Sequence, residues 1–82
     1  MNEKTVREAL RNYIKEAYIR DMEYDLADNE GIITGGFIDS VDLTDLAVFI
    51  EDEFGVEIPD PELTVEKMDT LNLMVARVMQ DL

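Results

Sequence analysis

The sequence predicts an all-α fold, a small four-helix bundle of three main helices plus one short helix. Two observations predict it: apolar residues recur at helical spacing in three segments, and glycines and prolines separate these segments. No segment shows the alternation of a β-strand. A chain of 82 residues fits one domain, so residues 1–82 are expected to share a single core.

The first main helix is expected over Thr5–Arg20, where one apolar stripe consists of Val6, Leu10, Tyr13, Ile14 and Ala17. Thr5 and Glu8 have the spacing of a capping box, which indicates the start of the helix. Between residues 21 and 39 the periodicity fades among acidic and small residues. This stretch is therefore predicted to be a long loop.

The second main helix is expected over Val41–Phe54. Ser40 is expected to be its N-cap, and Gly55 is expected to end it as a C-terminal cap. Its apolar stripe is assigned to the core and contains Leu43, Leu46, Ile50 and Phe54.

The remaining chain is broken by two prolines, Pro59 and Pro61, so residues 62–67 have room for only a turn or two of helix. Asp69 or Thr70 is then expected to cap the last main helix. The apolar stripe of that helix contains Leu71, Met74, Val75 and Val78.

Composition excludes several classes of function. The chain has no histidine and no cysteine, which removes imidazole bases, thiolate nucleophiles, disulfides and the common zinc ligands. A catalytic role of its own is therefore disfavoured, and no metal site is expected. The opening residues Met1-Asn2-Glu3-Lys4 lack the apolar core of a signal peptide, and no apolar run reaches membrane-spanning length, so a cytoplasmic location is expected.

The charge is strongly negative and unevenly placed. The net charge is −13, and residues 21–66 contain fifteen acidic side chains but no lysine or arginine. Such a field repels nucleic acid and anionic membranes and attracts basic protein surfaces. Protein partners are therefore expected, with no binding to nucleic acid or membranes. The alternative is that the acidic side chains only keep a small protein soluble.

Ser40 stands where the long loop enters the acidic second helix, within the sequence Gly36-Phe37-Ile38-Asp39-Ser40-Val41-Asp42-Leu43. This stretch resembles the attachment motif of the acyl carrier protein family, which is Asp-Ser-Leu or a close variant and here reads Asp39-Ser40-Val41. Three further stretches look like family features at the usual positions: Glu51-Asp52-Glu53-Phe54, Glu57-Ile58-Pro59-Asp60 and Glu66-Lys67-Met68. The resemblance covers essentially the whole chain and implies a bundle of the acyl carrier type.

The resemblance implies a carrier whose Ser40 hydroxyl accepts 4′-phosphopantetheine from coenzyme A. The donor enzyme would be a separate phosphopantetheinyl transferase, a holo-acyl-carrier-protein synthase, whose metal site Asp39 would assist. The thiol of the arm would hold acyl or aminoacyl groups as thioesters, and loading ligases and acyl-transfer enzymes would be further partners. A phosphodiester at Ser40 is also expected to meet free backbone N–H groups in the first turn of the helix.

A partner-binding surface is expected on the second helix. Val41 and Val48 lie seven residues apart among carboxylates, and exposed apolar residues in such a setting are typical of protein contacts. The predicted surface comprises Val41, Asp42, Asp45, Val48, Glu51 and Asp52. The carrier itself is expected to be a monomer.

The cargo is less well indicated. Ile38 and Val41 differ from the residues usual in fatty-acid carriers. Thr44 stands where an aliphatic residue is expected, and Phe49 stands where the side chain is usually smaller. These departures favour a short, polar or aminoacyl cargo, and they leave fatty-acid, polyketide and nonribosomal-peptide biosynthesis open.

Two other classes of protein share features with this sequence. An EF-hand calcium loop with Gly31 at its sixth position would begin at Leu26 and end at Phe37, which carry no carboxylate, so this register fails. An acidic protein-binding module or nucleic-acid mimic would bind through charge alone and would need no prosthetic group on Ser40.

Overall fold

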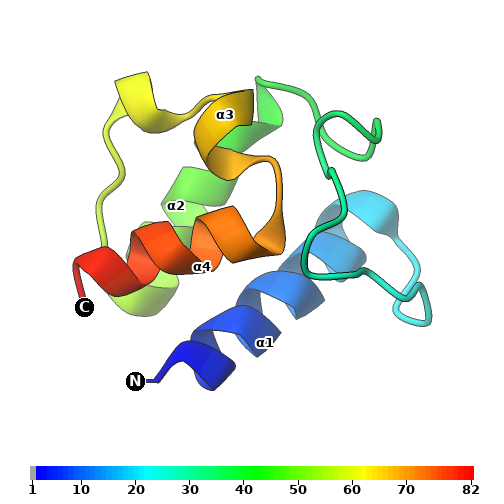
Figure 1. Ribbon diagram of the computed structural model, residues 1–82, viewed down its shortest axis with the longest axis horizontal. Helices are drawn as coiled ribbons and strands as arrows, with labels where there is room; N and C mark the ends of the chain where they lie inside the picture. Colours follow the sequence, from blue (N-terminus) through cyan, green and yellow to red (C-terminus); the bar gives the residue numbers. More distant parts are fainter. Residues whose placement is uncertain (1) are drawn as a thin grey trace.

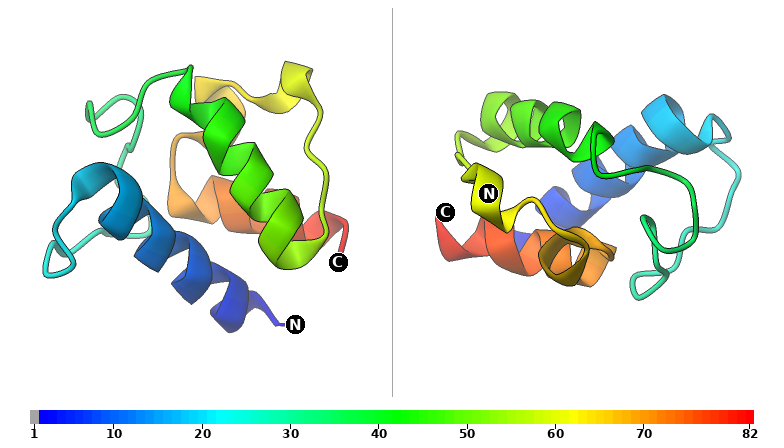
Figure 2. Two further views of the ribbon diagram at one scale, coloured as in Figure 1. Left: turned by 180° about the vertical axis from the view of Figure 1, so that it is seen from behind. Right: turned by 90° about the horizontal axis from the view of Figure 1, so that it is seen from above.

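The computed structural model describes residues 2–82. In these residues the secondary structure is entirely helical, as the sequence predicts. The elements are α1 (Glu3–Ile14), the π-helical turn η1 (Lys15–Ile19), α2 (Asp42–Phe54), the short 3-10 helix η2 (Asp60–Glu62), α3 (Val65–Met68) and α4 (Leu71–Gln80). Helices α1 and α4 pack side by side, and α2 crosses behind α4 in the view of Figure 1 and in front of it when seen from behind (Figure 2, left). No helix of residues 2–82 is both long and apolar enough to cross a membrane.

One hydrophobic core holds the helices together. The residues assigned to the core of the second and last helices are all buried, which confirms the stripe predictions. Three residues of the long loop, Leu26, Ile32 and Ile38, join them and anchor the loop against the bundle. Among the described residues, no polar or charged side chain is buried. Packing of apolar faces therefore dominates the stability of the fold.

The start and end of the first helix differ from the prediction. Helix α1 begins at Glu3, and the Asn2 side chain caps it by accepting a hydrogen bond from the Thr5 N–H at 2.9 Å. The predicted capping box of Thr5 and Glu8 is wrong because asparagine is the stronger N-cap and comes first in the chain. After Ile14 the helix widens into η1 and ends at Arg20, whose φ of 60° is left-handed.

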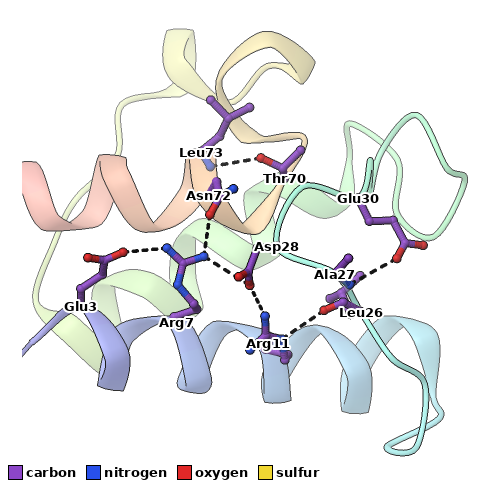
Figure 3. Close-up of polar contacts among 10 residues, drawn as sticks. All are labelled: Glu3, Arg7, Arg11, Leu26, Ala27, Asp28, Glu30, Thr70, Asn72 and Leu73. Carbon is purple, nitrogen blue, oxygen red and sulfur yellow. Dashed lines mark hydrogen bonds and ion pairs between the residues drawn. The ribbon is translucent and has the colours of Figure 1, made fainter.

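The long loop returns to the bundle at Asp28 (Figure 3). Its carboxylate pairs with Arg7 and Arg11 of α1, and its backbone carbonyl accepts the Asn72 N–H at 3.0 Å. Arg7 also donates to the Asn72 side chain at 2.7 Å. This network ties the loop, α1 and the start of α4 together. Its residues lie far from Ser40 in the sequence.

The segment after α2 is irregular, as its prolines predict. Gly55, with φ of 70°, ends α2 as expected. The short helix η2 is held to α4 by an ion pair between Glu62 and Arg77 at 2.7 Å. Of the two predicted caps for α4, Thr70 is the one used, because its side chain accepts the Leu73 N–H. Asp69 has a different set of partners.

Candidate functional site

Ser40 lies exposed in the turn that leads into α2, but it is not the N-cap. Instead, Asp39 Oδ1 accepts hydrogen bonds from the N–H groups of Val41 at 2.9 Å and Asp42 at 3.0 Å. Asp42 Oδ2 in turn accepts from the Asp39 N–H at 3.0 Å. The prediction for Ser40 is wrong because the preceding carboxylate takes the same N–H groups and is favoured by the positive end of the helix.

This reciprocal capping has two consequences for Ser40. The N–H groups of Val41 and Asp42 are already occupied, so the expectation of free N–H groups that meet a phosphodiester is wrong for these two. The Ser40 hydroxyl, in contrast, makes no hydrogen bond to any of residues 2–82. It is an accessible nucleophile on a backbone turn that its two neighbouring aspartates hold in place.

An open hollow of about 470 Å³ adjoins this serine. Its lining combines apolar side chains of the loop, one valine of α3 and the Asp39–Asp42 pair: Ile33, Gly36, Phe37, Ile38, Asp39, Ser40, Asp42 and Val65. Gly36 adopts a φ of 86°, a left-handed conformation that glycine accepts without strain. A flexible group attached to Ser40 has free space and apolar neighbours here.

A second hollow, of about 210 Å³, separates α2 from residues 57–63. Thr44, Val48 and Glu51 line it from α2, at spacings that place them on one side of the helix. Ile58 and Leu63 supply apolar walls on the other side, and Glu57 and Asp60 add carboxylates. This hollow is therefore only partly apolar.

Phe49 points toward α1 rather than into this second hollow. Its ring stacks on Tyr13, with centroids 3.9 Å apart and planes at 10°. It also meets Phe54 edge to face at 6.1 Å. The aromatic contact fills the space between α1 and α2.

The predicted partner residues all lie at or near the surface of α2. Val41 and Val48 are 76% and 53% exposed, unusually high values for valine. Glu51 and Asp52 are exposed and make no ion pair with any of residues 2–82. Asp42 is partly covered, because its carboxylate caps Asp39.

Asp45 differs from the other acids of this surface because α1 and η1 hold it. Its Oδ2 accepts hydrogen bonds from the hydroxyls of Tyr13, at 2.7 Å, and Tyr18. The hydrogen bond from Tyr18, followed by that from Tyr13, lowers the pKa of Asp45. Burial, followed by the hydrogen bond to Asp45, raises the pKa of both tyrosines.

The interpretation of the sequence missed the role of Asp69. Its carboxylate accepts hydrogen bonds from the N–H groups of Ile33 and Thr34 and from the Thr34 hydroxyl. The partners lie more than thirty positions from Asp69 in the chain, so no local pattern contains this signal.

Among residues 2–82, no group of three acidic, histidine or cysteine side chains is arranged so that it could hold a metal ion.

Comparison with known proteins agrees with this site. The family described as the phosphopantetheine attachment site matches residues 8–78. An acyl carrier protein of Lactobacillus acidophilus is 34% identical over 74 residues, which cover 87% of this chain and 90% of the relative. A D-alanyl carrier protein of Streptococcus suis is 28% identical over 75 residues, 92% of each chain.

The turn before α2 offers an exposed serine hydroxyl with open space beside it. The matching family carries 4′-phosphopantetheine, which is therefore the prosthetic group of this protein. The chain belongs to the phosphopantetheine attachment family, that of the acyl carrier proteins.

Proposed function

We propose that Ser40 carries the 4′-phosphopantetheine arm, and that residues 1–82 form a single carrier domain that delivers acyl or aminoacyl groups to partner enzymes. One observation carries the assignment: Ser40 is the only serine in the chain. It is also exposed, and no described residue bonds its hydroxyl. A prosthetic group that is attached through a serine can therefore be attached only at Ser40.

The contribution of the protein is to present this hydroxyl. The Asp39–Asp42 pair fixes the backbone around Ser40, so the residue is presented at a constant place, while its hydroxyl, which has no bond within residues 2–82, is free to turn toward a partner enzyme. The arm, once attached, supplies the thiol on which cargo is held as a thioester, since the chain has no cysteine. The chemistry of loading and transfer then belongs to the partners, and the carrier is not itself an enzyme.

The charge around Ser40 supports presentation of the arm outward. Asp39 and Asp42 lie on either side of the serine in the chain; the Asp39 carboxylate already accepts the N–H groups of Val41 and Asp42, and the Asp42 carboxylate accepts the Asp39 N–H. A phosphodiester placed between them gains little from the helix and is repelled by both aspartates. We infer that the phosphate faces solvent, where basic groups of a partner neutralise it.

The test is transfer of the arm by a broad-specificity phosphopantetheinyl transferase with coenzyme A. We expect the mass of one phosphopantetheine to be added and peptide mapping to locate it at Ser40. Ser40→Ala should abolish the addition, whereas Thr44→Ala should be modified normally. Thr44 is a matched control because its hydroxyl is also exposed, one turn further along the chain.

Two results would contradict the assignment. One is an unmodified wild-type chain with several transferases, which would favour an acidic binding module or nucleic-acid mimic without a prosthetic group. The other is a mass increase that persists in Ser40→Ala.

The partners proposed are the transferase, a loading ligase and acyl-transfer enzymes, which would bind the α2 surface. Exposed Val41 and Val48 offer apolar contacts, and Glu51 and Asp52 offer charges that are free of internal ion pairs among the described residues. A net charge of −13 selects basic partner surfaces over nucleic acid or anionic membranes. We propose a monomeric carrier that acts in the cytoplasm.

The cargo we propose is short, polar or aminoacyl. The second hollow exposes the Thr44 hydroxyl, which an alkyl chain cannot satisfy. Glu51, Glu57 and Asp60 line the same hollow, and their negative charge favours the ammonium group of an aminoacyl thioester. The names of the relatives include both an acyl carrier and a D-alanyl carrier.

A further inference from the structure

We propose that Asp69 is a positioning residue for Ser40: it holds the loop that delivers the serine to the transferase. The inference rests on the proposed role of Ser40 and adds a residue outside the attachment motif. Asp69 lies in the junction between α3 and α4, and its side chain hydrogen-bonds to Ile33 and Thr34 but to neither Ser40 nor Asp39. Its effect must therefore pass through the loop.

Asp69 binds three consecutive residues of that loop. Its Oδ1 accepts the N–H groups of Ile33 at 2.8 Å and Thr34 at 3.0 Å, and its Oδ2 accepts the Thr34 hydroxyl at 2.8 Å. Its backbone carbonyl accepts the Ile32 N–H at 2.7 Å. Four hydrogen bonds from one residue fix this turn against the helical bundle.

The same turn is bonded to the segment that ends at Ser40. The Ile32 carbonyl accepts the N–H groups of Phe37 at 3.0 Å and Ile38 at 3.3 Å. The Ile38 side chain is buried in the core, and Asp39 and Ser40 follow directly. A short chain of contacts thus runs from Asp69 through Ile32 to the residues that place the serine.

Two glycines in this turn leave the space that the contact between Thr34 and Asp69 needs. A Cβ on Gly31 would collide with the Thr34 hydroxyl and lie 3.2 Å from Asp69 Oδ2. A Cβ on Gly35 would collide with the Gly31 carbonyl oxygen. The turn therefore admits the Thr34–Asp69 contact only with glycine at both positions. Although burial opposes ionisation, the hydrogen bonds from Thr34 and Ile33 lower the pKa of Asp69, which keeps its carboxylate charged.

The second tie of the same loop provides a control. Asp28 holds the loop to Arg7 and Arg11 at the α1 side, before the turn that Asp69 holds. Loss of Asp28 loosens the loop away from Ser40, whereas loss of Asp69 loosens the part that leads to it. If position matters for transfer, the two aspartates should differ in their effect on Ser40 modification.

The experiment compares Asp69→Ala, Thr34→Val and Asp28→Ala in the full chain. We measure kcat/KM for phosphopantetheine transfer to each carrier, and amide hydrogen exchange over residues 33–40. Displacement of a reacting atom by a small distance slows a reaction strongly, so we expect kcat/KM to fall about tenfold in Asp69→Ala. Loss of one hydrogen bond in Thr34→Val should lower it about threefold, and Thr34→Ser should restore it.

Asp69→Ala and Thr34→Val should also show faster amide hydrogen exchange at residues 33 and 34. The control Asp28→Ala should keep a transfer rate within about twofold of the wild type. The inference is overturned if folded Asp69→Ala is modified at the wild-type rate, or if Asp28→Ala is slowed equally. If Asp69→Ala does not fold, Thr34→Val decides.

Failure of the proposed function has a separate signature. If the wild type is never modified, the role of Ser40 fails, and hydrogen exchange then tests the positioning alone. Unchanged exchange over residues 33–40 in Thr34→Val would overturn the inference in that case as well.

Discussion

At the scale of single residues, three aspartates near the site have different physical roles. Asp39 caps α2 and frees the Ser40 hydroxyl. Asp45 accepts two phenol hydroxyls from the end of the first helical segment, and Asp69 holds the loop. In the sequence they are equivalent negative charges, but only their hydrogen-bond donors decide what each one does.

Asp45 leads to a prediction about pH. Its pKa is lowered in the folded protein, so its contribution to stability is present at neutral pH and is lost as pH falls through the folded pKa. We expect Tyr18→Phe to lower the free energy of unfolding by about 1 kcal/mol at pH 7, because the bond is to a charged but exposed carboxylate. Near pH 3 the loss should be smaller.

The measurement is urea unfolding of the wild type, Tyr18→Phe, Asp45→Asn and the double variant at both pH values. The coupling energy between Tyr18 and Asp45 should be present at pH 7 and shrink at acid pH. Equal coupling at both values would show that the contact does not depend on the charge of Asp45.

At the scale of elements, α2 presents three different sides. Its apolar stripe enters the core, and Phe49 and Asp45 face the first helical segment. A third side carries exposed Val41, Val48 and the free acids of the proposed partner surface. Because Asp45 already has internal partners, Asp52 is the cleaner probe of partner binding.

We therefore predict that Asp52→Lys slows association with the transferase by about threefold at low salt, because one attractive surface charge is reversed. Glu8→Lys is the matched control, since Glu8 is also exposed but lies on α1. Rates are measured by stopped flow over a range of ionic strength, and the difference should diminish as salt screens the charges. Equal rates for wild type and Asp52→Lys at low salt would place the recognition surface elsewhere.

At the scale of the whole molecule, the buried interior is apolar and the acids remain outside. One core takes residues from α1, the long loop, α2, the segment after it, α3 and α4. One hollow adjoins the start of α2 and the other lies between the middle of α2 and residues 57–63, and both include polar or charged lining. This arrangement supports the proposal of a cargo that does not need burial.

The corresponding prediction concerns thermal stability. A buried methylene contributes roughly 0.8 kcal/mol, so a long acyl chain that entered the bundle would raise Tm strongly. We expect short and long acyl forms to melt close to the unacylated holo form, as monitored by circular dichroism. A marked rise in Tm with the long chain alone, with amide shifts along the inner face of α2, would contradict a short or polar cargo and support a fatty-acid role.

Much of this architecture was predictable from local sequence. The apolar stripes placed α2 and the start of α4 within about one residue and identified their core positions, because helix periodicity and burial are coupled along a single segment. The first helix, expected over Thr5–Arg20, is instead α1 followed by the π-helical turn η1, and Tyr13 and Ala17 of its stripe are only partly buried. The prolines predicted the irregular stretch after α2, and Gly55 predicted its end. The motif around Ser40 indicated the family, which the comparisons confirm.

The sequence by itself thus determined the helices, the core stripes and the carrier class, since each depends on residues that are close together in the chain. Tertiary structure decided which side chains of different elements contact one another. The links from Asp69 to Thr34, from Tyr18 to Asp45 and from Asp28 to Arg11 join residues that lie far apart in sequence. Such bonds depend on how the segments pack, and no pattern within one segment contains that information.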